Sequence, residues 1–420
     1  MRTHSGDVHE KTRDGLMRLL YPDPHPVPDD CPESMQILHT ADALGKIGVE
    51  TTVVTPPRTR PVEVRDILGR ELSANVSLQH LGSSFHRWLP VRTNRLFYRS
   101  VIRSLRPSGV DAILVRNLKM AERLLRRAPA VPLFFETHEL FAQSYREEHR
   151  EPSWRERRKL AALTRREEFV YRRARGLLVL TPLLLEDIRS AYGVDTPAVV
   201  VPDGVDLEMT GTLDTAPPRN DPPVLLYLGS LHPWKGIDTL IEAMVHLKQP
   251  ARLRIVGGND RRIAELQAHA GRLGVADRVE FSGPCLPGKR YEIIQQADIC
   301  LLPLAPTSIG SRYTSPLKLF EYLALGKPVV VSNLPSMRAV LEDGTHALMA
   351  ASGEPAAFAA AIGRLLANPS LRLQLGQAAR AHARNFGWTQ RAISIRDFLA
   401  GELAHEPHKP TASEIAETES

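Results

Sequence analysis

The sequence predicts an α/β protein made of two doubly wound domains that face each other across a cleft. Short apolar runs alternate with amphipathic helical segments in both halves of the chain. The runs are continuously apolar, which is typical of parallel strands covered on both faces. The 420 residues are also sufficient for two or three domains.

The first half opens with a strand, a helix and a second strand. The run LMRLLYPDP is short, apolar and ended by prolines. The segment PESMQILHTADALGKIG has apolar residues at helical spacing, a proline at its start and Gly48 at its end, which predicts a helix. The apolar run VETTVVTPP follows it. This strand–helix–strand unit is typical of the start of a Rossmann-like sheet.

The pattern continues to the end of both halves. Weaker strands are expected at 76–81 and 112–116, a strong one at VPLFFETHE, and a charged, salt-bridged surface helix at 145–175. A second series runs from PVLLYLGSL to PVVVSN, after a stretch rich in proline and turn-forming residues. We therefore expect a disordered tail at 1–15, an N-terminal domain at 16–207, a linker at 208–222, a C-terminal domain at 223–385, a helix at 386–403 that returns to the N-terminal domain, and a disordered tail at 404–420.

Composition narrows the function classes. The net charge of +6 suits anionic small molecules or anionic surfaces, and we expect no nucleic-acid partner. The cysteines Cys31, Cys285 and Cys300 lie far apart, which argues against a zinc site or a disulfide framework and favours a reducing compartment. The N-terminus has no apolar signal region, and no run is long enough to span a membrane. We expect a cytoplasmic protein.

The segment SRYTSPLKLFEYLALGKPVVVSN (311–333) carries the strongest chemical signal. Pro316 stands where the first helical turn begins, with Thr314 and Ser315 available as caps. Free backbone N–H groups at a helix start suit a diphosphate, and Arg312 and Lys318 add positive charge nearby. Glu321, further along the helix, could accept hydrogen bonds from ribose hydroxyls. The alternative is an ordinary capped helix with a solvated glutamate.

Two further segments bring polar residues to strand ends. In YLGSLHPWKGIDTLIEA (227–243), Gly229 lets the backbone approach a ligand and Lys235 is placed to meet a phosphate. In FFETHELF (134–141), a buried strand delivers His138 to the same kind of edge. Each segment has a purely structural alternative: Lys235 could be a surface lysine in a tight turn, and His138 could be a structural histidine.

Taken together, VVPDGVD, LLYLGSLHPWKGIDTLIEAM, LRIVGG, VEFSGP, ADICLLPL and SPLKLFEYLALGKPVVVSN resemble glycosyltransferase family four, whose members are retaining enzymes with the glycosyltransferase-B fold. The resemblance is dense over 200–350 and weaker over 17–200. It implies transfer of a sugar from a nucleotide diphosphate sugar, UDP-linked in preference to GDP-linked, to an acceptor that is a glycan, a lipid-linked molecule or a small molecule, in polysaccharide or glycoconjugate biosynthesis.

The resemblance also implies roles for particular residues. Lys235 would bind the donor diphosphate and Glu321 the ribose. The backbone at Ser315, Pro316 and Leu317 would hold the sugar and phosphates, and Gly283 and Pro284 would lie near the base. His138 would sit beside the reacting carbon of the donor sugar.

The sequence departs from the family pattern at two of these positions. Ser230 stands where the family often has an arginine that contacts phosphate, and we expect Arg312 to replace it. Tyr313 stands where the first glutamate of the Glu-x7-Glu motif is common, and a tyrosine cannot accept hydrogen bonds from sugar hydroxyls as a carboxylate does. The Pro- and Asp-rich loop PDPHPVPDDCPE also replaces the usual Gly-rich turn.

The implied mechanism is front-face transfer, in which the leaving diphosphate helps to deprotonate the acceptor. Lys235, Arg312 and the helix start would stabilise the leaving group. No acidic metal-binding cluster is evident, so we expect no obligatory metal and no cofactor beyond the donor itself. Residues 84–106 carry six arginines and no acid, with aromatic residues between them. They suit peripheral contact with an anionic membrane at its inner face, or a helix packed on the sheet.

Two other functions stay open at this point. A nucleotide-sugar epimerase on the same architecture would need additional acid–base residues in the cleft. A non-catalytic nucleotide-sugar-binding protein, or a partner of an active subunit, would explain the departures at Ser230 and Tyr313.

Overall fold

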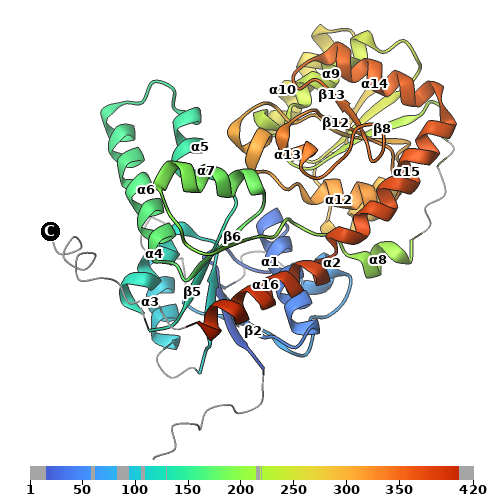
Figure 1. Ribbon diagram of the computed structural model, residues 1–420. Coiled ribbons are helices and arrows are strands. Elements are labelled where there is room, and N and C mark those ends of the chain that lie inside the picture. Colours follow the sequence, from blue (N-terminus) through green and yellow to red (C-terminus); the bar gives the residue numbers. More distant parts are fainter. Residues whose placement is uncertain are drawn as a thin grey trace, which may run out of the picture.

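The computed structural model describes residues 16–57, 62–82, 94–105, 109–128, 130–213, 218 and 220–405. They form two lobes, each built around one parallel sheet, which confirms the predicted fold class (Figure 1). The sheets contain seven and six strands. The predicted tail at 1–15 lies outside the described residues, as do residues 406–420 of the tail predicted at 404–420, whereas Ala404 is the last residue of α16.

The first sheet has the strand order β3-β2-β1-β4-β5-β6-β7. The chain reverses its direction across the sheet between β1 and β4, and in doubly wound sheets ligands bind at the carboxyl ends of the strands beside such a point. The strands are β1 (Arg18–Pro22), β2 (Glu50–Thr55), β3 (Val76–His80), β4 (Ala112–Val115), β5 (Leu133–Thr137), β6 (Gly176–Val179) and β7 (Ala198–Val200).

The second sheet repeats this plan with the order β10-β9-β8-β11-β12-β13. Its point of reversal lies between β8 and β11, which pair in parallel. The strands are β8 (Val224–Leu228), β9 (Arg252–Val256), β10 (Val279–Phe281), β11 (Ile299–Leu302), β12 (Val329–Ser332) and β13 (Leu348–Ala350).

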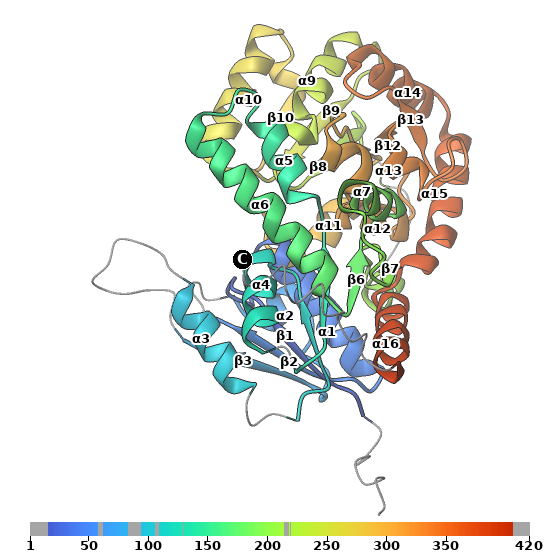
Figure 2. The same cartoon turned by 60° about the vertical axis from the view of Figure 1, so that its left-hand side comes forward.

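Helices cover both faces of each sheet (Figures 1 and 2). In the first half these are α1 (Pro32–Lys46), α2 (Val64–Leu68), α3 (Arg95–Ser104), α4 (Leu118–Arg127), α5 (Phe141–Glu148), α6 (Trp154–Arg173), α7 (Pro182–Tyr192) and α8 (Leu207–Gly211). In the second half the α-helices are α9 (Ile237–His246), α10 (Asp260–Arg272), α11 (Arg290–Gln295), α12 (Leu317–Ala324), α13 (Pro335–Arg338), α14 (Pro355–Ala367), α15 (Pro369–Ala383) and α16 (Trp388–Ala404). Short turns of other helix types are η1 (Pro233–Lys235), η2 (Ala276–Arg278), η3 (Pro287–Lys289), η4 (Ile309–Tyr313) and η5 (Arg384–Phe386).

The charged stretch at 145–175 forms two helices rather than one. Helix α5 ends at Glu148, and α6 begins at Trp154 after Pro152. Ser153 starts α6 with a capping box in which its side chain and that of Glu156 each accept a backbone hydrogen bond. The break follows from Pro152, because a residue that precedes a proline is disfavoured in helical conformation.

The chain crosses between the lobes at two places that lie side by side. The first crossing follows β7 and includes α8, so the span 208–222 begins with a short helix. The second follows η5 and leads into α16, which packs on α1 of the first lobe. The crossings are joined because the N–H of Val205 donates to the carbonyl of Phe386 at 2.8 Å. The two connections between the domains therefore form one shared junction.

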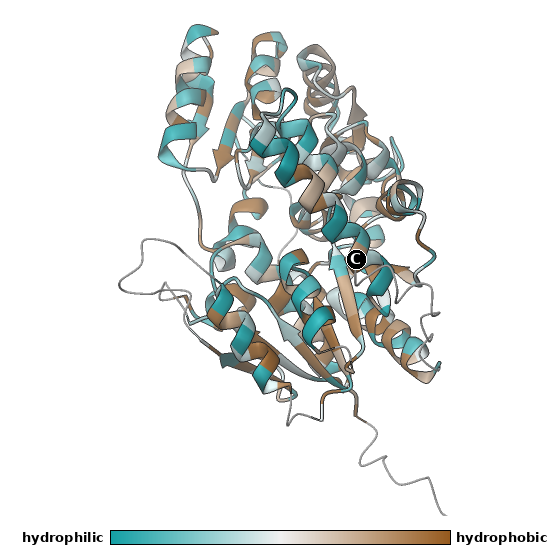
Figure 3. Ribbon diagram, turned by 90° about the vertical axis from the view of Figure 1, so that its left-hand side faces the viewer, coloured by the Kyte–Doolittle hydropathy of each residue, from teal (hydrophilic) through white to brown (hydrophobic). Residues whose placement is uncertain are grey.

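The cores lie on the two faces of each sheet. Brown, apolar strands stand between helices that carry both apolar and teal, polar residues (Figure 3). In strand β5 the core positions a residue of the site. Phe134 and Phe135 are fully buried on opposite faces of the sheet, and they fix the strand that His138 directly follows.

Candidate active site

Glycines at the ends of β8 and β9 bring two loops into backbone contact. Gly229 and Gly257 have φ angles of +136° and +123°, a region that non-glycine residues rarely adopt. The N–H of Gly229 donates to the carbonyl of Val256 at 2.8 Å. A Cβ atom on Gly257 would lie 2.1 Å from the carbonyl oxygen of Gly229. These loops line the carboxyl edge of the second sheet with backbone, as a phosphate site requires.

Lys318, in the first turn of α12, extends to this edge. Its Nζ donates to the hydroxyl of Tyr227 at 3.0 Å and lies 4.2 Å from the centre of the Tyr227 ring. A Cβ on Gly229 would come within 2.3 Å of that Nζ, so the glycine leaves room for the ammonium group. Burial lowers the pKa of Lys318 well below its usual value, and the charge of Lys235 lowers it further.

Lys235 stands beside it on the turn η1. Its Nζ lies 3.5 Å from the centre of the Trp234 ring, and burial lowers its pKa to about 7. Gly236 holds the turn tightly, because a Cβ there would lie 1.8 Å from the carbonyl oxygen of Pro303. Among the described residues, no carboxylate lies within ion-pair distance of Lys235 or Lys318. The charge of Glu321 acts on Lys318 from a greater distance, but two neighbouring lysines with no ion-paired carboxylate form a site suited to an anion.

The start of α12 differs in detail from the expectation. Pro316 is the N-cap, and neither Thr314 nor Ser315 caps the helix with its side chain. The Ser315 hydroxyl instead accepts a hydrogen bond from the N–H of Asp203 at 2.9 Å. The expected caps are wrong because this hydroxyl binds the opposite domain. The first N–H groups of α12, from Leu317 onward, therefore keep their positive end uncapped by side chains.

Glu321 follows one turn later and is paired with an arginine that the sequence did not single out. Its Oε2 accepts a hydrogen bond from Nη2 of Arg290, at the start of α11. Arg290 also lies 3.0 Å from the sulfur of Met35 in α1, across the domain boundary. An isolated arginine at a helix start gave no sequence signal for this pairing.

Arg312 does not approach the lysine pair as a free charge. Its Nε donates to Asp187 at 2.7 Å and its Nη2 to Glu186 at 2.9 Å, both in α7 of the first domain. Its carbonyl accepts a hydrogen bond from Thr181 at 2.6 Å. Because two carboxylates already neutralise this guanidinium, the structure gives no support to Arg312 as the replacement for the arginine missing at Ser230.

Of the other predicted residues, Ser230, Gly283 and Pro284 lie at the same sheet edge, whereas Tyr313 does not. Tyr313 is buried against the core of the first domain, so it does not take the place of the missing carboxylate. The carbonyl of Ser230 accepts a hydrogen bond from Tyr227 at 2.7 Å, and Ser230 lines a cavity of about 490 Å³. Gly283, with φ +65°, accepts a hydrogen bond from Gly257 at 2.6 Å, and Pro284 beside it is exposed.

His138 belongs to a charged cluster on the first domain. Its Nε2 lies 2.8 Å from Glu136, and its Nδ1 lies 3.1 Å from a guanidinium nitrogen of Arg116. Glu136 is fully buried and also accepts hydrogen bonds from Gln36 and from Arg391 of α16. Burial alone would raise the pKa of Glu136, but Arg391 and His138 hold it well below its usual range.

Asp203, in the loop after β7, joins the two halves of the site. Its N–H binds Ser315, and its carboxyl is close enough to Arg391 and His138 to interact with their charges. Asp203 is 7% exposed and its Oδ1 has no hydrogen-bond partner, so burial raises its pKa. The sequence contained this residue in VVPDGVD, but its position became evident only from the structure.

The described residues form neither a metal-binding cluster nor a membrane-spanning helix. No group of three or more His, Cys, Asp or Glu side chains in that part of the chain could hold a metal ion. No helix formed by the described residues is long and apolar enough to cross a membrane.

The stretch at 84–106 is described only from residue 94 to residue 105. There Phe97 and Tyr98 are buried, so α3 packs these rings on the sheet and cannot insert them into a membrane. Arg99 and Arg103 are exposed on its outer side.

Each domain matches a family of known proteins. Residues 34–209 match the family described as Glycosyltransferase Family 4, and residues 222–368 match the family described as Glycosyl transferases group 1. Together these matches cover most of the chain. The chain belongs to glycosyltransferase family four, and its fold is the glycosyltransferase-B fold.

Curated relatives and solved structures agree with this assignment. D-inositol 3-phosphate glycosyltransferase of Xylanimonas cellulosilytica is 32% identical over 57% of this chain and 60% of its own length. A protein of that name from Acidothermus cellulolyticus is 34% identical over half of each chain. The matches thus span between half and two thirds of these relatives. Sucrose-phosphate synthase from Thermosynechococcus elongatus superposes with a TM-score of 0.74, at 20% identity over 92% of this chain and 99% of its own.

A second solved structure has a sugar nucleotide bound. Anabaena Alr3699/HepE in complex with UDP-glucose has a TM-score of 0.68, at 17% identity over 92% of this chain and all of its own. At such identities the likeness shows the fold alone.

Proposed function

We propose that this protein transfers a sugar from a nucleotide diphosphate sugar to an acceptor. The observation that carries the proposal is the uncompensated pair Lys235 and Lys318, set between glycine loops and the uncapped start of α12. A diphosphate supplies the negative charge that both lysines lack. Glu321 lies one turn further along and is the residue proposed to bind the ribose.

UDP-sugars are the favoured donors, and GDP-sugars are the second choice. The fold neighbour that binds UDP-glucose supports this order. Gly283 and Pro284 border the position proposed for the base, while Ser230 takes the place of a phosphate contact. The proposal includes no metal, because the lysines and the helix start supply the positive charge that a metal would otherwise bring.

The proposed reaction retains the configuration of the sugar. The bond between the anomeric carbon and the diphosphate oxygen breaks, and the acceptor oxygen bonds to the same face of that carbon. The acceptor proton passes to the departing diphosphate. Lys235, Lys318 and the α12 N–H groups stabilise the developing charge, and His138, held by Glu136 and Arg116, positions the sugar from the opposite domain.

A small phosphorylated polyol is the first acceptor to test, because the curated relatives are named for D-inositol 3-phosphate. Lipid-linked glycans are the second class. For these, the arginines of α3 would contact the surface of an anionic membrane, without insertion of Phe97 or Tyr98.

The experiment measures release of nucleoside diphosphate from UDP-, GDP-, ADP- and dTDP-sugars, with and without inositol phosphates, by wild-type protein and Glu321→Ala. Slow release from one donor, accelerated by an acceptor and lost in the variant, supports the proposal and names the donor.

An isomerised donor would indicate an epimerase. Tight donor binding with no release in the presence of cell extract would favour a non-catalytic partner, for which Tyr313 in place of glutamate is the supporting feature. Turnover abolished by a chelator would contradict metal independence.

A further inference from the structure

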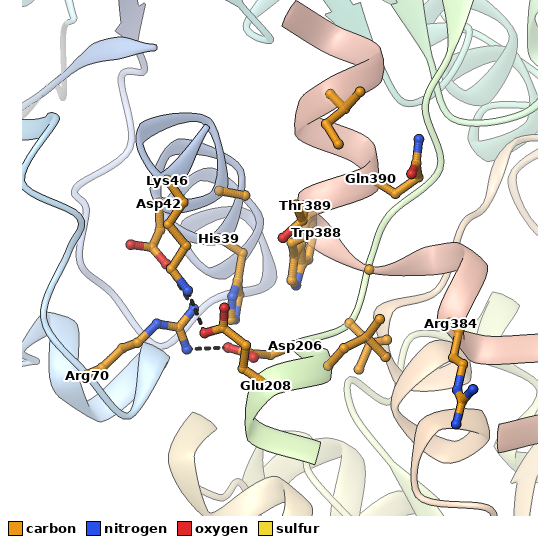
Figure 4. Close-up of a pocket in the computed structure, with 15 residues that line it drawn as sticks. His39, Asp42, Lys46, Arg70, Asp206, Glu208, Arg384, Trp388, Thr389 and Gln390 are labelled. Carbon is orange, nitrogen blue, oxygen red and sulfur yellow. Dashed lines mark hydrogen bonds and ion pairs between the residues drawn. The ribbon is translucent and has the colours of Figure 1, made fainter. Parts of the chain in front are cut away.

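A cavity of about 220 Å³ lies at the junction of the two domains, away from the lysine pair. Its walls come from α1, from the loop after α2, from the first crossing at 205–208 and from the start of α16 (Figure 4). The crossings meet here, since the N–H of Trp388 donates to the carbonyl of Val205 at 3.3 Å. Any molecule held in this cavity contacts the first domain and both connections to the second.

The carboxylates around the cavity are already satisfied. Asp42 accepts from Arg70 and from the N–H of Ser73, each at 2.8 Å. Asp206 accepts from Arg70 and from the N–H of Met209. The third acid, Glu208, is paired with Lys46 at 2.6 Å. Each of these acids therefore already has a cationic partner, either Arg70 or Lys46.

Hydrogen-bond donors, in contrast, remain unused at the cavity. Helix α16 has 17 residues and begins beside it at Trp388, with Gly387 as an N-cap that offers no side chain, and no acidic residue lies in its first turn. Its N-terminal charge is thus unopposed on the helix itself. Arg384 is exposed at the other end of the cavity, and its guanidinium makes no hydrogen bond or ion pair with the described residues.

His39, which lines the cavity, independently indicates that a hydrogen-bond partner is missing there. It is 7% exposed, stacks on Trp388 with ring centres 5.1 Å apart, and its buried Nδ1 has no hydrogen-bond partner. The Nε of Arg70 is likewise buried and unpartnered. Burial lowers the pKa of His39 to about 4, so the ring is neutral at pH 7 and one of its nitrogens carries a proton to donate.

We propose that this junction cavity binds a small phosphate-bearing metabolite and that the bound phosphate biases the angle between the domains. The phosphate oxygens accept from the N–H groups of Thr389 and Gln390 in the first turn of α16, from Nδ1–H of His39 and from Arg384. The volume is sufficient for a phosphate or a monophosphorylated small molecule. Because the ligand joins α1 of the first domain to the second crossing, its affinity depends on domain orientation, and by linkage it changes donor affinity equally.

Binding is tested without any donor, so its outcome does not depend on the proposed transferase activity. Inorganic phosphate, glucose 6-phosphate and glucose are titrated into the full chain by calorimetry. We expect saturable binding of at least one phosphate compound and none of glucose. Thr389→Pro removes one N–H from the first turn of α16, where the N–H groups have no partner within the helix, whereas Thr389→Ala keeps that N–H. We expect Thr389→Pro and Arg384→Gln each to weaken binding about ten-fold, since hydrogen bonds to charged groups contribute about that much.

Thr389→Ala and Arg364→Gln, the latter on the exposed side of α14, serve as matched controls and should bind like wild type. His39→Phe keeps the stack on Trp388 but loses Nδ1, and should also bind more weakly. Equal binding by all variants would mean general attraction to a basic protein and would overturn the proposal. Absence of saturable binding by either phosphate compound, or preference for glucose, would overturn it too. The coupling is measured separately, as the shift in the Kd of UDP when the phosphate compound is present.

Discussion

Arg290 donates a hydrogen bond to Glu321 at the donor edge of the second domain, and the two side chains are only 10% and 7% exposed. A buried ion pair is costly to break from one side, because the remaining charge stays in a poorly solvated place. The pair also fixes the carboxylate that we propose for the ribose. Arg290 is therefore a positioning residue for donor binding as well as a structural one.

Arg290→Met should lower the free energy of unfolding by about 3 kcal/mol, since it leaves the carboxylate of Glu321 buried and unpaired. It should also weaken UDP binding. Lys289→Met is the matched control, because Lys289 is the preceding residue and its pair with Glu292 is exposed. We expect that control to change stability by less than about 1 kcal/mol. Urea unfolding and UDP calorimetry measure both effects, and equal behaviour of the two variants would contradict the role of Arg290.

Donor affinity should fall as the pH rises above 7. The pKa of Lys235 is lowered to about 7 by burial, so the free protein loses this positive charge between pH 6.5 and 8. A bound diphosphate favours the charged form and binds with proton uptake above that pKa, which weakens binding as the pH increases. The Kd of UDP, measured from pH 6.5 to 9, should rise in wild type. Lys235→Arg keeps its charge and should flatten the profile; an equally steep profile in this variant would assign the titration to another group.

The sequence predicted the fold class because continuously apolar runs alternate with segments of helical period in both halves. It also placed Lys235, Glu321 and the start of α12 on one edge, since all follow strands of one parallel sheet. It could not find Arg290 or Arg391, because their partners lie 31 and 255 residues away in the chain. The prediction that Ser315 caps α12 was wrong for the same reason, because its hydroxyl accepts a hydrogen bond from Asp203 of the other domain instead.

The effects of substituting Arg312 and its partner Asp187 on UDP affinity should not be additive, because either substitution removes the same ion pair. If Arg312 binds α7 rather than phosphate, Arg312→Ala and Asp187→Ala should have similar effects on UDP affinity, and the double variant should add little. The pair is one-quarter to one-third exposed, so its loss should reduce stability by no more than about 1 kcal/mol. UDP calorimetry on the four proteins decides the question. A large loss of affinity in Arg312→Ala alone would restore the phosphate role that the sequence suggested.

Gly236→Ala should disrupt the turn that carries Lys235. The added Cβ would lie 1.8 Å from the carbonyl oxygen of Pro303, and the backbone has a φ of +70°, which disfavours any residue with a Cβ. We expect a loss of about 2 kcal/mol in the free energy of unfolding, typical of strained backbone, together with weaker UDP binding. Gly211→Ala is the control, because its Cβ would meet no atom within 4 Å. Normal stability of Gly236→Ala would show that the turn can relax without moving Lys235.

His138→Ala should separate catalysis from donor binding. His138 lies on the first domain, held by Glu136 and Arg116, while the lysine pair lies on the second. Its removal should therefore leave the Kd of UDP within about two-fold and lower kcat by about 100-fold, the loss typical for one group that stabilises a transition state. His149→Ala, between α5 and α6, is the control. Loss of UDP affinity in His138→Ala, with kcat unchanged, would move this residue from the reacting sugar to the nucleotide.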